Sequence, residues 1–350
     1  MSLRHHVFAA ALQTVANLRA DRWLREFAQG CGVILMFHRV RPQRNECFAP
    51  NRELEITPEF LDFVLTELRR EGFEIVPLEA VPYRLRKHRV SRPFAVLTFD
   101  DGYRDVAEYA WPILKRHDGA WTLFVTTEFA EGKGRPWWIE LEEALTRLDR
   151  IILRDEGNLR LPARTASEKQ AGLIAVCERL CAGPEERLLA ATSDLAIQAG
   201  IDVGQVVRTH CLGWDEIRAL ASDCDVTIGA HGISHSSLAK HDASTAAREI
   251  AESRVLLEHR LGRSVDHFAY PFGGRFAAGA REFRLARHAG FATAVTTRPG
   301  HLFPDHADHL HALPRVSING RFQSNSALRA LLSGIPFLAL NRGRVAPIEA

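Results

Sequence analysis

The 350-residue chain is 46% hydrophobic and 25% charged, a composition typical of globular proteins that argues against a disordered or fibrous chain. Its 45 basic and 43 acidic residues leave a net charge of +2, without the basic excess typical of nucleic-acid-binding proteins, so we expect no nucleic-acid partner. The longest apolar runs fall well short of the ~20 residues that a membrane-spanning helix needs. The six cysteines show neither zinc-ribbon spacing nor a disulfide framework.

Residues 1–30 predict an amphipathic helix. Its apolar side chains lie near helical spacing with arginines among them, at Phe8, Leu12, Val15, Trp23, Leu24 and Phe27. No small-residue cleavage site follows cleanly, so the segment does not resemble a signal peptide. Such a helix either packs on its own domain or makes peripheral contact with a membrane, and both interpretations stay open. With the scattered cysteines, these features favour a cytoplasmic location, at the inner membrane surface if the helix binds lipid.

From residue 31 onward, apolar segments of strand length alternate with amphipathic segments of helix length. The predicted strands are, in chain order, Val33–Phe37, Phe73–Val76, Phe94–Phe99, Trp121–Val125, Asp225–Ala230, Val265–Tyr270 and Ala292–Thr296. Helices are predicted from Thr57, a good N-cap followed by Pro58, and over 105–117, 243–261 and 281–288. This alternation implies parallel βαβ units, which suit either a barrel or a doubly wound sheet.

The segment 130–212 does not alternate between strands and helices. It contains helical patterns over 139–148, 167–181 and 185–199 and almost no strand signal. We interpret it as a helical lobe inserted between two strands. The predicted organisation is therefore an N-terminal helix over 1–30, an α/β unit over 31–320 that contains the lobe, and a C-terminal tail over 321–350.

Two adjacent carboxylates, Asp100 and Asp101, directly follow the apolar strand predicted over 94–99. The carboxyl ends of strands are where α/β folds place their functional sites. Neighbouring carboxylates repel each other, which raises the pKa of one of them unless a cation binds nearby. If Asp101 binds a metal, Asp100 is left as a free base beside it; the alternative is a solvated Asp-Asp-Gly turn.

Two histidines, His231 and His235, follow the strand predicted over 225–230. Two histidines four residues apart, a carboxylate from elsewhere and an open position form a catalytic site of the zinc type. The alternative is a pair of unrelated loop histidines, since the chain has 16 histidines. Because both motifs follow strands that are expected to run parallel, we expect them to meet at one rim of the sheet or barrel.

As a set, these motifs resemble those of the polysaccharide deacetylases, which include the nodulation-protein-B-like chitooligosaccharide deacetylases and the family 4 carbohydrate esterases. The resemblance covers roughly residues 30–320. It rests on four segments in the family's order, namely Leu35–Val40, Asp100–Tyr103, His231–His235 and Tyr270–Gly273. It implies a distorted (β/α)7 barrel, here with an inserted helical lobe.

The resemblance also implies roles for individual residues. Asp100 is the catalytic base, and Asp101, His231 and His235 are the metal ligands. Zinc is the usual cation in such folds, and cobalt or nickel fits the same ligands. The backbone N–H of Tyr103 would stabilise the oxyanion together with the metal.

Two departures from the family pattern concern catalytic side chains. Many relatives have an arginine two residues before the motif proline that orients the base, whereas this chain has Ala269. Arg315, in the last strand, can take that role; the alternative is a surface arginine. Many relatives also carry a Leu-x-His near the C-terminus as the general acid, where this chain has Ala312. His311 and His38 are the candidates for the acid.

The expected reaction is hydrolysis of N-acetyl groups on an N-acetylhexosamine oligomer or polymer, so the expected partner is a carbohydrate. Tyr270 and Pro271 would line the substrate site, and Trp138 in the lobe either stacks on a sugar ring or packs within the protein. Two other functions stay open. One is deacylation of a small amide or O-acetyl ester at the same site. The other is a catalytically inactive carbohydrate-binding protein, which would explain the missing arginine and the unassigned acid.

Overall fold

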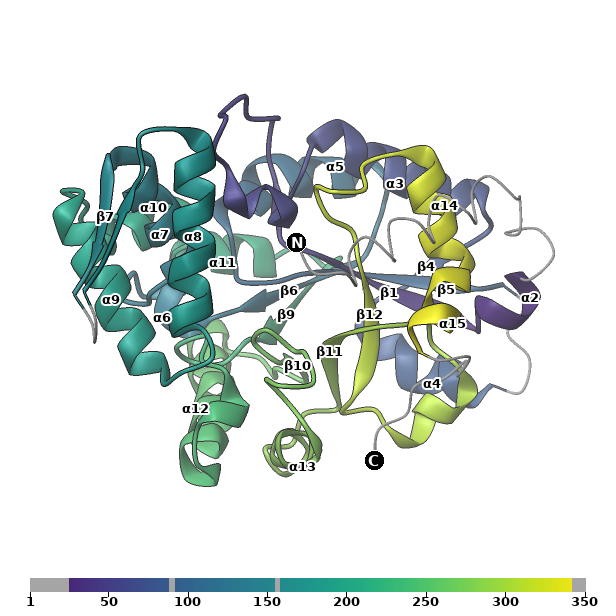
Figure 1. Ribbon diagram of the computed structural model, residues 1–350. Coiled ribbons are helices and arrows are strands. Elements are labelled where there is room, and N and C mark those ends of the chain that lie inside the picture. Colours follow the sequence, from purple (N-terminus) through teal and green to yellow (C-terminus); the bar gives the residue numbers. More distant parts are fainter. Residues whose placement is uncertain (1–24, 88–91, 155–157, 342–350) are drawn as a thin grey trace.

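The computed structural model describes residues 25–87, 92–154 and 158–341, and its centre is a closed barrel of seven parallel strands (Figure 1). The order around the ring is β1, β12, β11, β10, β9, β6 and β5, and pairing of β1 with β5 closes it. The strands are β1 Gly32–Phe37, β5 Phe94–Phe99, β6 Trp121–Val125, β9 Val226–Ala230, β10 His267–Ala269, β11 Thr293–Pro299 and β12 Leu313–Ser317. The (β/α)7 barrel implied by the resemblance is confirmed.

Short strands and helices surround this ring. Strand β4 (Glu74–Ile75) runs parallel to the start of β5, and β2 (Arg39–Val40) pairs with β3 (Glu55–Ile56) just past β1. The helices outside the lobe are α2 Arg25–Ala28, α3 Pro58–Arg70, α4 Val81–Arg86, α5 Trp111–Arg116, α6 Thr127–Ala130, α11 Trp214–Ala221, α12 Ala243–Leu261, α13 Ala280–His288, α14 Asn325–Ser333 and α15 Ile335–Leu340. Single turns of tighter or wider helix are η2 Pro50–Leu54, η3 Leu78–Ala80, η4 Val106–Ala110, η5 Leu238–Lys240 and η6 Pro304–Asp308.

Several predicted elements are confirmed closely. The bounds of β5, β6 and α12 agree with the prediction, and α3 begins at Pro58, where Thr57 Oγ1 accepts a hydrogen bond from Phe60 N at 3.1 Å. This bond satisfies one of the backbone N–H groups that a helix start leaves without a partner.

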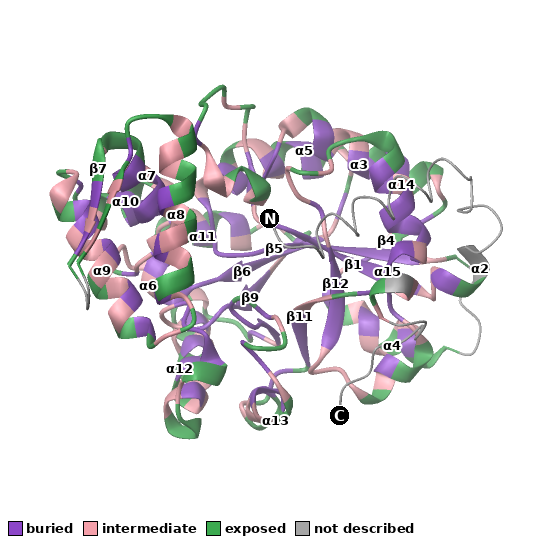
Figure 2. Cartoon of the chain, viewed as in Figure 1, coloured by how far each residue is buried: buried purple, intermediate pink, exposed green. Residues whose placement is uncertain are grey.

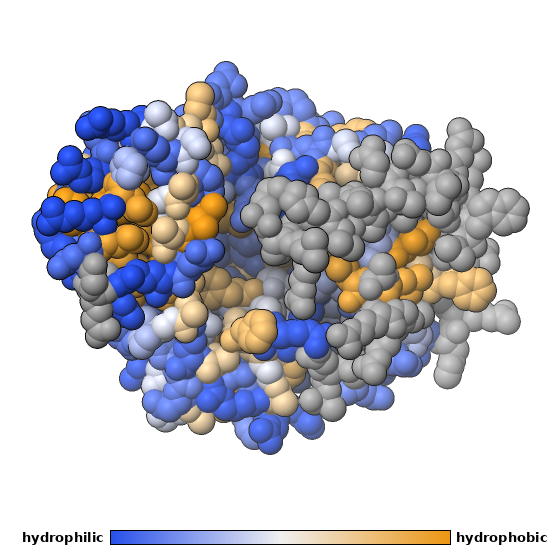
Figure 3. Space-filling view, viewed as in Figure 1, coloured by the Kyte–Doolittle hydropathy of each residue, from blue (hydrophilic) through white to orange (hydrophobic). Residues whose placement is uncertain are grey.

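The part of the chain between α6 and α11 forms a separate lobe, drawn in teal in Figure 1. Its helices are α7 Trp137–Arg147, α8 Ala166–Leu180, α9 Glu185–Gln198 and α10 Val203–His210, and it also contains an antiparallel hairpin of β7 Arg150–Leu153 and β8 Leu159–Pro162. The expectation of almost no strand in this segment is wrong. The strands are only four residues long, and the hairpin is held by packing, since Ile151 fits against Gly172 of α8. On the face shown in Figure 3, apolar side chains gather on this lobe among charged ones.

Each barrel strand is buried on both sides, as Figure 2 shows for the centre of the molecule, and successive residues face opposite ways. In β1, Leu35 and Phe37 pack outward against the helices, whereas Ile34 packs inside the barrel. In β5, Phe94 and Val96 face inward in the same way. The position of a residue along its strand therefore decides whether its side chain reaches the mouth of the barrel.

The two ends of the chain differ in how far the structure describes them. Most of the helix predicted over 1–30 lies outside the described residues. The predicted tail over 321–350 contains α14 and α15, and Leu328 and Leu331 of α14 are buried. Within 25–87, 92–154 and 158–341, no helix has the length and apolar character needed to cross a membrane.

Candidate active site

Strand alternation brings four of the predicted side chains to the carboxyl-terminal mouth of the barrel. His38, Asp100 and His231 each follow a strand by one residue. Because side chains alternate along a strand, these three point into the barrel. Arg315 lies in the middle of β12 and is only 1% exposed. Pairing of β1 with both β5 and β12 places three of these residues on neighbouring strands.

Asp101, His231 and His235 form a buried cluster with the geometry of a metal site. The Nε2 atoms of His231 and His235 lie 3.2 and 3.1 Å from Oδ1 of Asp101. The three ligand atoms lie within 4.8 Å of one another. Asp101 and His235 have positive φ angles of 71° and 62°, each of which costs roughly 1–3 kcal/mol. Strain of this kind concentrates at functional sites, where the surrounding structure maintains it.

The hydrogen bonds and charges of this cluster fit a cation. His231 Nδ1 donates to the carbonyl oxygen of Ala269 at 2.7 Å, which directs Nε2 toward Asp101. Oδ1 of Asp101 and Nδ1 of His235 are buried without a hydrogen-bond partner among the described residues. Burial alone would raise the pKa of Asp101, but His235 and His231 hold it well below its usual value. A charged carboxylate and two imidazole nitrogens that face one point are a fitting ligand set for a divalent metal.

Asp100 is held by a bidentate ion pair with Arg315. Two guanidinium nitrogens of Arg315 donate to Oδ1 and Oδ2 of Asp100, each at 2.7 Å. Arg315 also donates to Thr296 O at 2.8 Å and to Thr98 Oγ1 at 3.1 Å, so its own orientation is fixed. Burial would raise the pKa of Asp100, but Arg315 more than offsets this, and the pKa lies below its usual value. The structure thus brings Arg315 to the carboxylate that it was expected to orient.

His38 faces the same space from the end of β1. Its pKa is lowered below the usual histidine value, chiefly by burial, while the charges of Asp101 and Asp100 act in the opposite direction. Arg315 and His231 are its other electrostatic neighbours, so His38 lies beside both the ion pair and the metal cluster.

A buried glutamate that sequence reasoning missed holds the loop between the two histidines. Glu249 on α12 accepts hydrogen bonds from the backbone N–H groups of Ile233 at 2.9 Å and Ser234 at 3.0 Å, and from Ser234 Oγ at 2.9 Å. The signal in the sequence is a charged residue on the apolar face of a helix, beside Ala246 and Ile250.

The lobe contributes Trp138 to the wall of the site. Its ring centre lies 4.8 Å from that of His235, and its Nε1 donates to the hydroxyl of Tyr103 at 2.8 Å. Arg39 lies over the Tyr103 ring at 4.7 Å and pairs with Asp105 at 2.7 Å. The Tyr103 side chain therefore helps to hold Trp138 in the wall of the site. Its backbone N–H makes no hydrogen bond within the described part of the chain.

Two predicted site residues lie elsewhere, which corrects the prediction. Tyr270 comes one position after the inward-facing Ala269, so its side chain packs outside the barrel, where its hydroxyl donates to His311 O at 2.9 Å. His311 precedes β12, at the amino-terminal end of the barrel, and its Nε2 donates to Phe291 O at 2.8 Å. Neither side chain reaches the cluster. Pro271, by contrast, is buried against the loop that carries the two histidines.

Comparison with known proteins agrees with this geometry. The profile of the family described as polysaccharide deacetylase matches residues 87–177 and 187–293, together more than half of the chain. The chain belongs to the polysaccharide deacetylase family. A search of curated proteins finds no significant match.

Solved structures share the fold at low sequence identity. The Streptococcus pyogenes deacetylase PplD, solved in complex with acetate, is 18% identical with a TM-score of 0.57, and the match covers 85% of this chain and 97% of that one. IcaB from Ammonifex degensii is also 18% identical, with a TM-score of 0.53 over 86% of this chain and 97% of its own. The polysaccharide deacetylase BC0361 from Bacillus cereus is 16% identical, with a TM-score of 0.54 over 86% and 68%.

Proposed function

We propose that this protein is a metal-dependent deacetylase that removes N-acetyl groups from N-acetylhexosamine oligosaccharides or polysaccharides. The observation that carries the proposal is the buried cluster of Asp101, His231 and His235 beside Asp100, a carboxylate kept ionised by Arg315. We propose zinc as the metal, with cobalt or nickel as ions that the same ligands accept.

The side chains divide the work of amide hydrolysis among them. A divalent ion held by the cluster would polarise the acyl carbonyl and acidify a water molecule. Asp100 would take the proton of the attacking water as general base, and Arg315 fixes the plane of that carboxylate. The backbone N–H of Tyr103 would donate to the oxyanion that develops on the substrate.

The leaving amine needs a proton, and the protonated imidazolium form of His38 is the proposed donor. It lies at the same mouth as Asp100, whereas His311 lies at the other end of the barrel. Trp138, half-buried beside His235, would offer a ring for one face of the sugar.

The proposed location follows from sequence features. We place the protein in the cytoplasm, at the inner membrane surface if the basic segment over 1–30 contacts lipid. Fractionation of cells that express the full chain, compared with a chain lacking residues 1–24, would detect such contact.

The test compares wild type with Asp100→Asn. Wild type should bind about one metal ion and release acetate from chitooligosaccharides faster than from small amides or O-acetyl esters. Asp100→Asn should keep the metal and lose roughly a hundredfold to ten-thousandfold in kcat, because the general base is removed and the ligands remain. Metal content and acetate release are measured on the same preparations.

Each other outcome identifies a different function. Faster release from small amides or esters would move the substrate away from sugars. If the protein binds no metal, or if Asp100→Asn is as active as wild type, the proposed mechanism is contradicted. The favoured function is then that of a carbohydrate-binding protein without activity.

A further inference from the structure

A cavity of about 610 Å³ lies on the same rim of the barrel as the Asp–His cluster but shares no residue with it. Its lining comes from the segment after β1, which includes β3 and the start of α3, and from the loop after β12. Gln323 of that loop accepts a hydrogen bond from Thr57 N at 2.9 Å, which joins the two walls. The volume is within the range of roughly 300–1,000 Å³ found for small-molecule sites.

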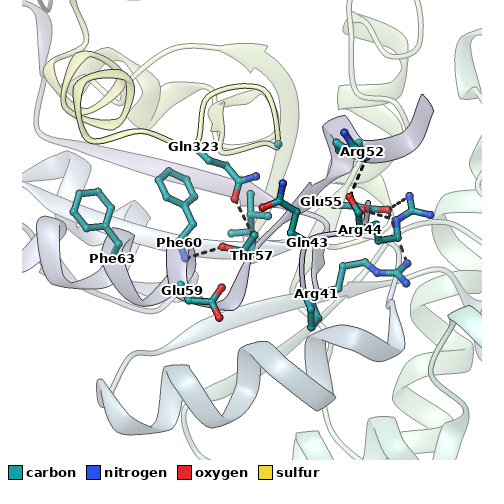
Figure 4. Close-up of a pocket in the computed structure, with 13 residues that line it drawn as sticks. Arg41, Gln43, Arg44, Arg52, Glu55, Thr57, Glu59, Phe60, Phe63 and Gln323 are labelled. Atoms are coloured by element: carbon teal, nitrogen blue, oxygen red, sulfur yellow. Dashed lines mark hydrogen bonds and ion pairs between the residues drawn. The ribbon is translucent and has the colours of Figure 1, made fainter. Parts of the chain in front are cut away.

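The cavity has two chemically different ends, as Figure 4 shows. Phe60 and Phe63 of α3 lie at one end, with ring centres 6.0 Å apart. Arg41, Arg44 and Arg52 lie toward the other end, and the side chains of Gln43, Thr57 and Gln323 lie between. An aromatic surface suits the apolar face of a sugar ring, and amides and hydroxyls suit its hydroxyl groups.

The three arginines at the cationic end differ in how far their charges are satisfied. Arg44 donates to Glu55 at 2.6 and 3.0 Å and to Glu142 at 3.0 Å. Arg52 donates to two backbone carbonyl oxygens. Arg41 makes a single ion pair, 3.9 Å from a Glu55 carboxylate already engaged by Arg44, and its side chain donates no hydrogen bond within the described residues.

Arg41 is therefore a half-buried guanidinium with unused donors in a cavity. Burial, and next the charge of Arg39, lower its pKa, which agrees with a cation short of anionic partners. Guanidinium groups bind carboxylates and phosphates through two parallel hydrogen bonds. Glu55 also lines the cationic end, but Arg44 engages both of its carboxylate oxygens, and the exposed Glu59 lies at the aromatic side. The unused donors of Arg41 therefore mark the place for an anion.

We propose that this cavity is a subsite for a negatively charged sugar residue of the substrate, whose carboxylate or phosphate pairs with Arg41 while its ring packs on Phe63, which the buried Phe60 supports. The inference rests on the proposed function for its link to catalysis. The link is topological, since β1 lies between β5, which leads to Asp100, and β12, which carries Arg315. A polymer held at Asp100 would then extend over the end of β1 into the cavity.

Binding is tested without turnover, on metal-loaded Asp100→Asn protein, by calorimetry. The probes are a tetrasaccharide of alternating glucuronate and N-acetylglucosamine and a neutral tetrasaccharide of N-acetylglucosamine. Arg41→Gln in this background should weaken binding of the acidic probe about tenfold and leave the neutral probe unchanged, because a charge-assisted hydrogen-bonded pair is lost. Gln43→Glu, which places a negative charge in the middle of the cavity, should have the same selective effect. Glucuronate and glucose 6-phosphate as competitors identify which anionic group binds better.

Arg154→Gln is the matched control, because it removes the same charge from an exposed ion pair with Asp194 on the lobe. It should change binding of neither probe. Equal loss for both probes in Arg41→Gln, or no loss for either, would overturn the proposal, as would glucose competing as well as glucuronate. Because binding is read on an inactive variant, these outcomes are independent of acetate release, which alone tests the deacetylase function.

Discussion

The pair formed by Asp100 and Arg315 shows how one residue sets the chemistry of another. Both are buried at the mouth of the barrel, where an unpaired carboxylate would take up a proton. Arg315 reaches Asp100 through both guanidinium nitrogens and is itself held by Thr98 and Thr296. It approaches from β12. The family resemblance places this arginine two residues before the motif proline, where this chain has Ala269.

Loss of this ion pair should change the pH dependence of activity. Arg315 keeps the pKa of Asp100 below its usual value, so the base stays ionised as the pH falls through the usual carboxylate range. In Arg315→Gln, Arg315 no longer offsets the effect of burial, so the pKa of Asp100 rises and activity should be lost at a higher pH on the acid side. The measurement is kcat/KM against pH, and Arg315→Lys, which keeps the charge, should shift the acid limb less. An unchanged acid limb in Arg315→Gln would contradict the assignment of Asp100 as the base.

Helix α12 holds the loop that carries His231 and His235 in place through one carboxylate, that of Glu249. Glu249 accepts two backbone N–H groups and one hydroxyl from Ile233 and Ser234, between the two histidines. His235 in this loop has a φ angle of +62°, a conformation unfavourable for a residue other than glycine, which the surrounding hydrogen bonds must maintain. The helix therefore fixes two histidines that lie on a loop.

Glu249→Ala should weaken metal binding roughly ten- to a hundredfold, the usual effect of removing a group that orients metal ligands. The dissociation constant is measured by competition with a chelator, and the thermal stability of the metal-free protein is measured alongside. Glu282→Ala is the control, because Glu282 is equally buried and accepts from Gly279 N at 2.8 Å at the start of α13, away from the loop. Both variants should lose stability, and only Glu249→Ala should lose metal affinity. Equal metal affinities in the two variants would reduce Glu249 to a structural role.

At the scale of the whole molecule, the sequence predicts the parallel strands well because strands buried on both sides are continuous apolar runs. These runs leave a barrel and a doubly wound sheet open, and the family resemblance selects the barrel. The sequence also predicts the meeting of Asp100 and His231, since both follow such runs. The hairpin over 150–162 has no such signal, because its strands are short and depend on contacts with α8.

The errors in the predicted site have physical causes. A strand predicted over 265–270 does not reveal which of Ala269 and Tyr270 faces the barrel, and a one-residue difference reverses the side. His311 is a candidate for the acid because it adjoins Ala312, the position of the Leu-x-His histidine in relatives. It lies in the turn before β12, however, at the amino-terminal end of the barrel and away from the mouth. Glu249 acts through tertiary hydrogen bonds that no local pattern specifies.

The lobe and the barrel are connected at the site itself. Trp138 donates to the Tyr103 hydroxyl. Glu185, at the start of α9, pairs at 2.8 Å with His241, which follows His235 in the chain. Lys240 donates to the carbonyl oxygens of Cys181 and Gly183, at 2.6 and 2.9 Å. The loop that carries His235 is therefore fixed from the lobe as well as from α12.

This coupling predicts that metal stabilises lobe and barrel together. A ligand that binds only the folded state at a thousand times its dissociation constant adds about 4 kcal/mol to the free energy of unfolding. Calorimetry should show one unfolding transition, with a Tm that falls when a chelator removes the metal. Asp101→Ala should unfold at the same Tm with and without added metal, because one of the three ligands is missing. Two transitions, of which only one depends on metal, would mean that the lobe unfolds independently and that its contacts with the histidine loop contribute little to the site.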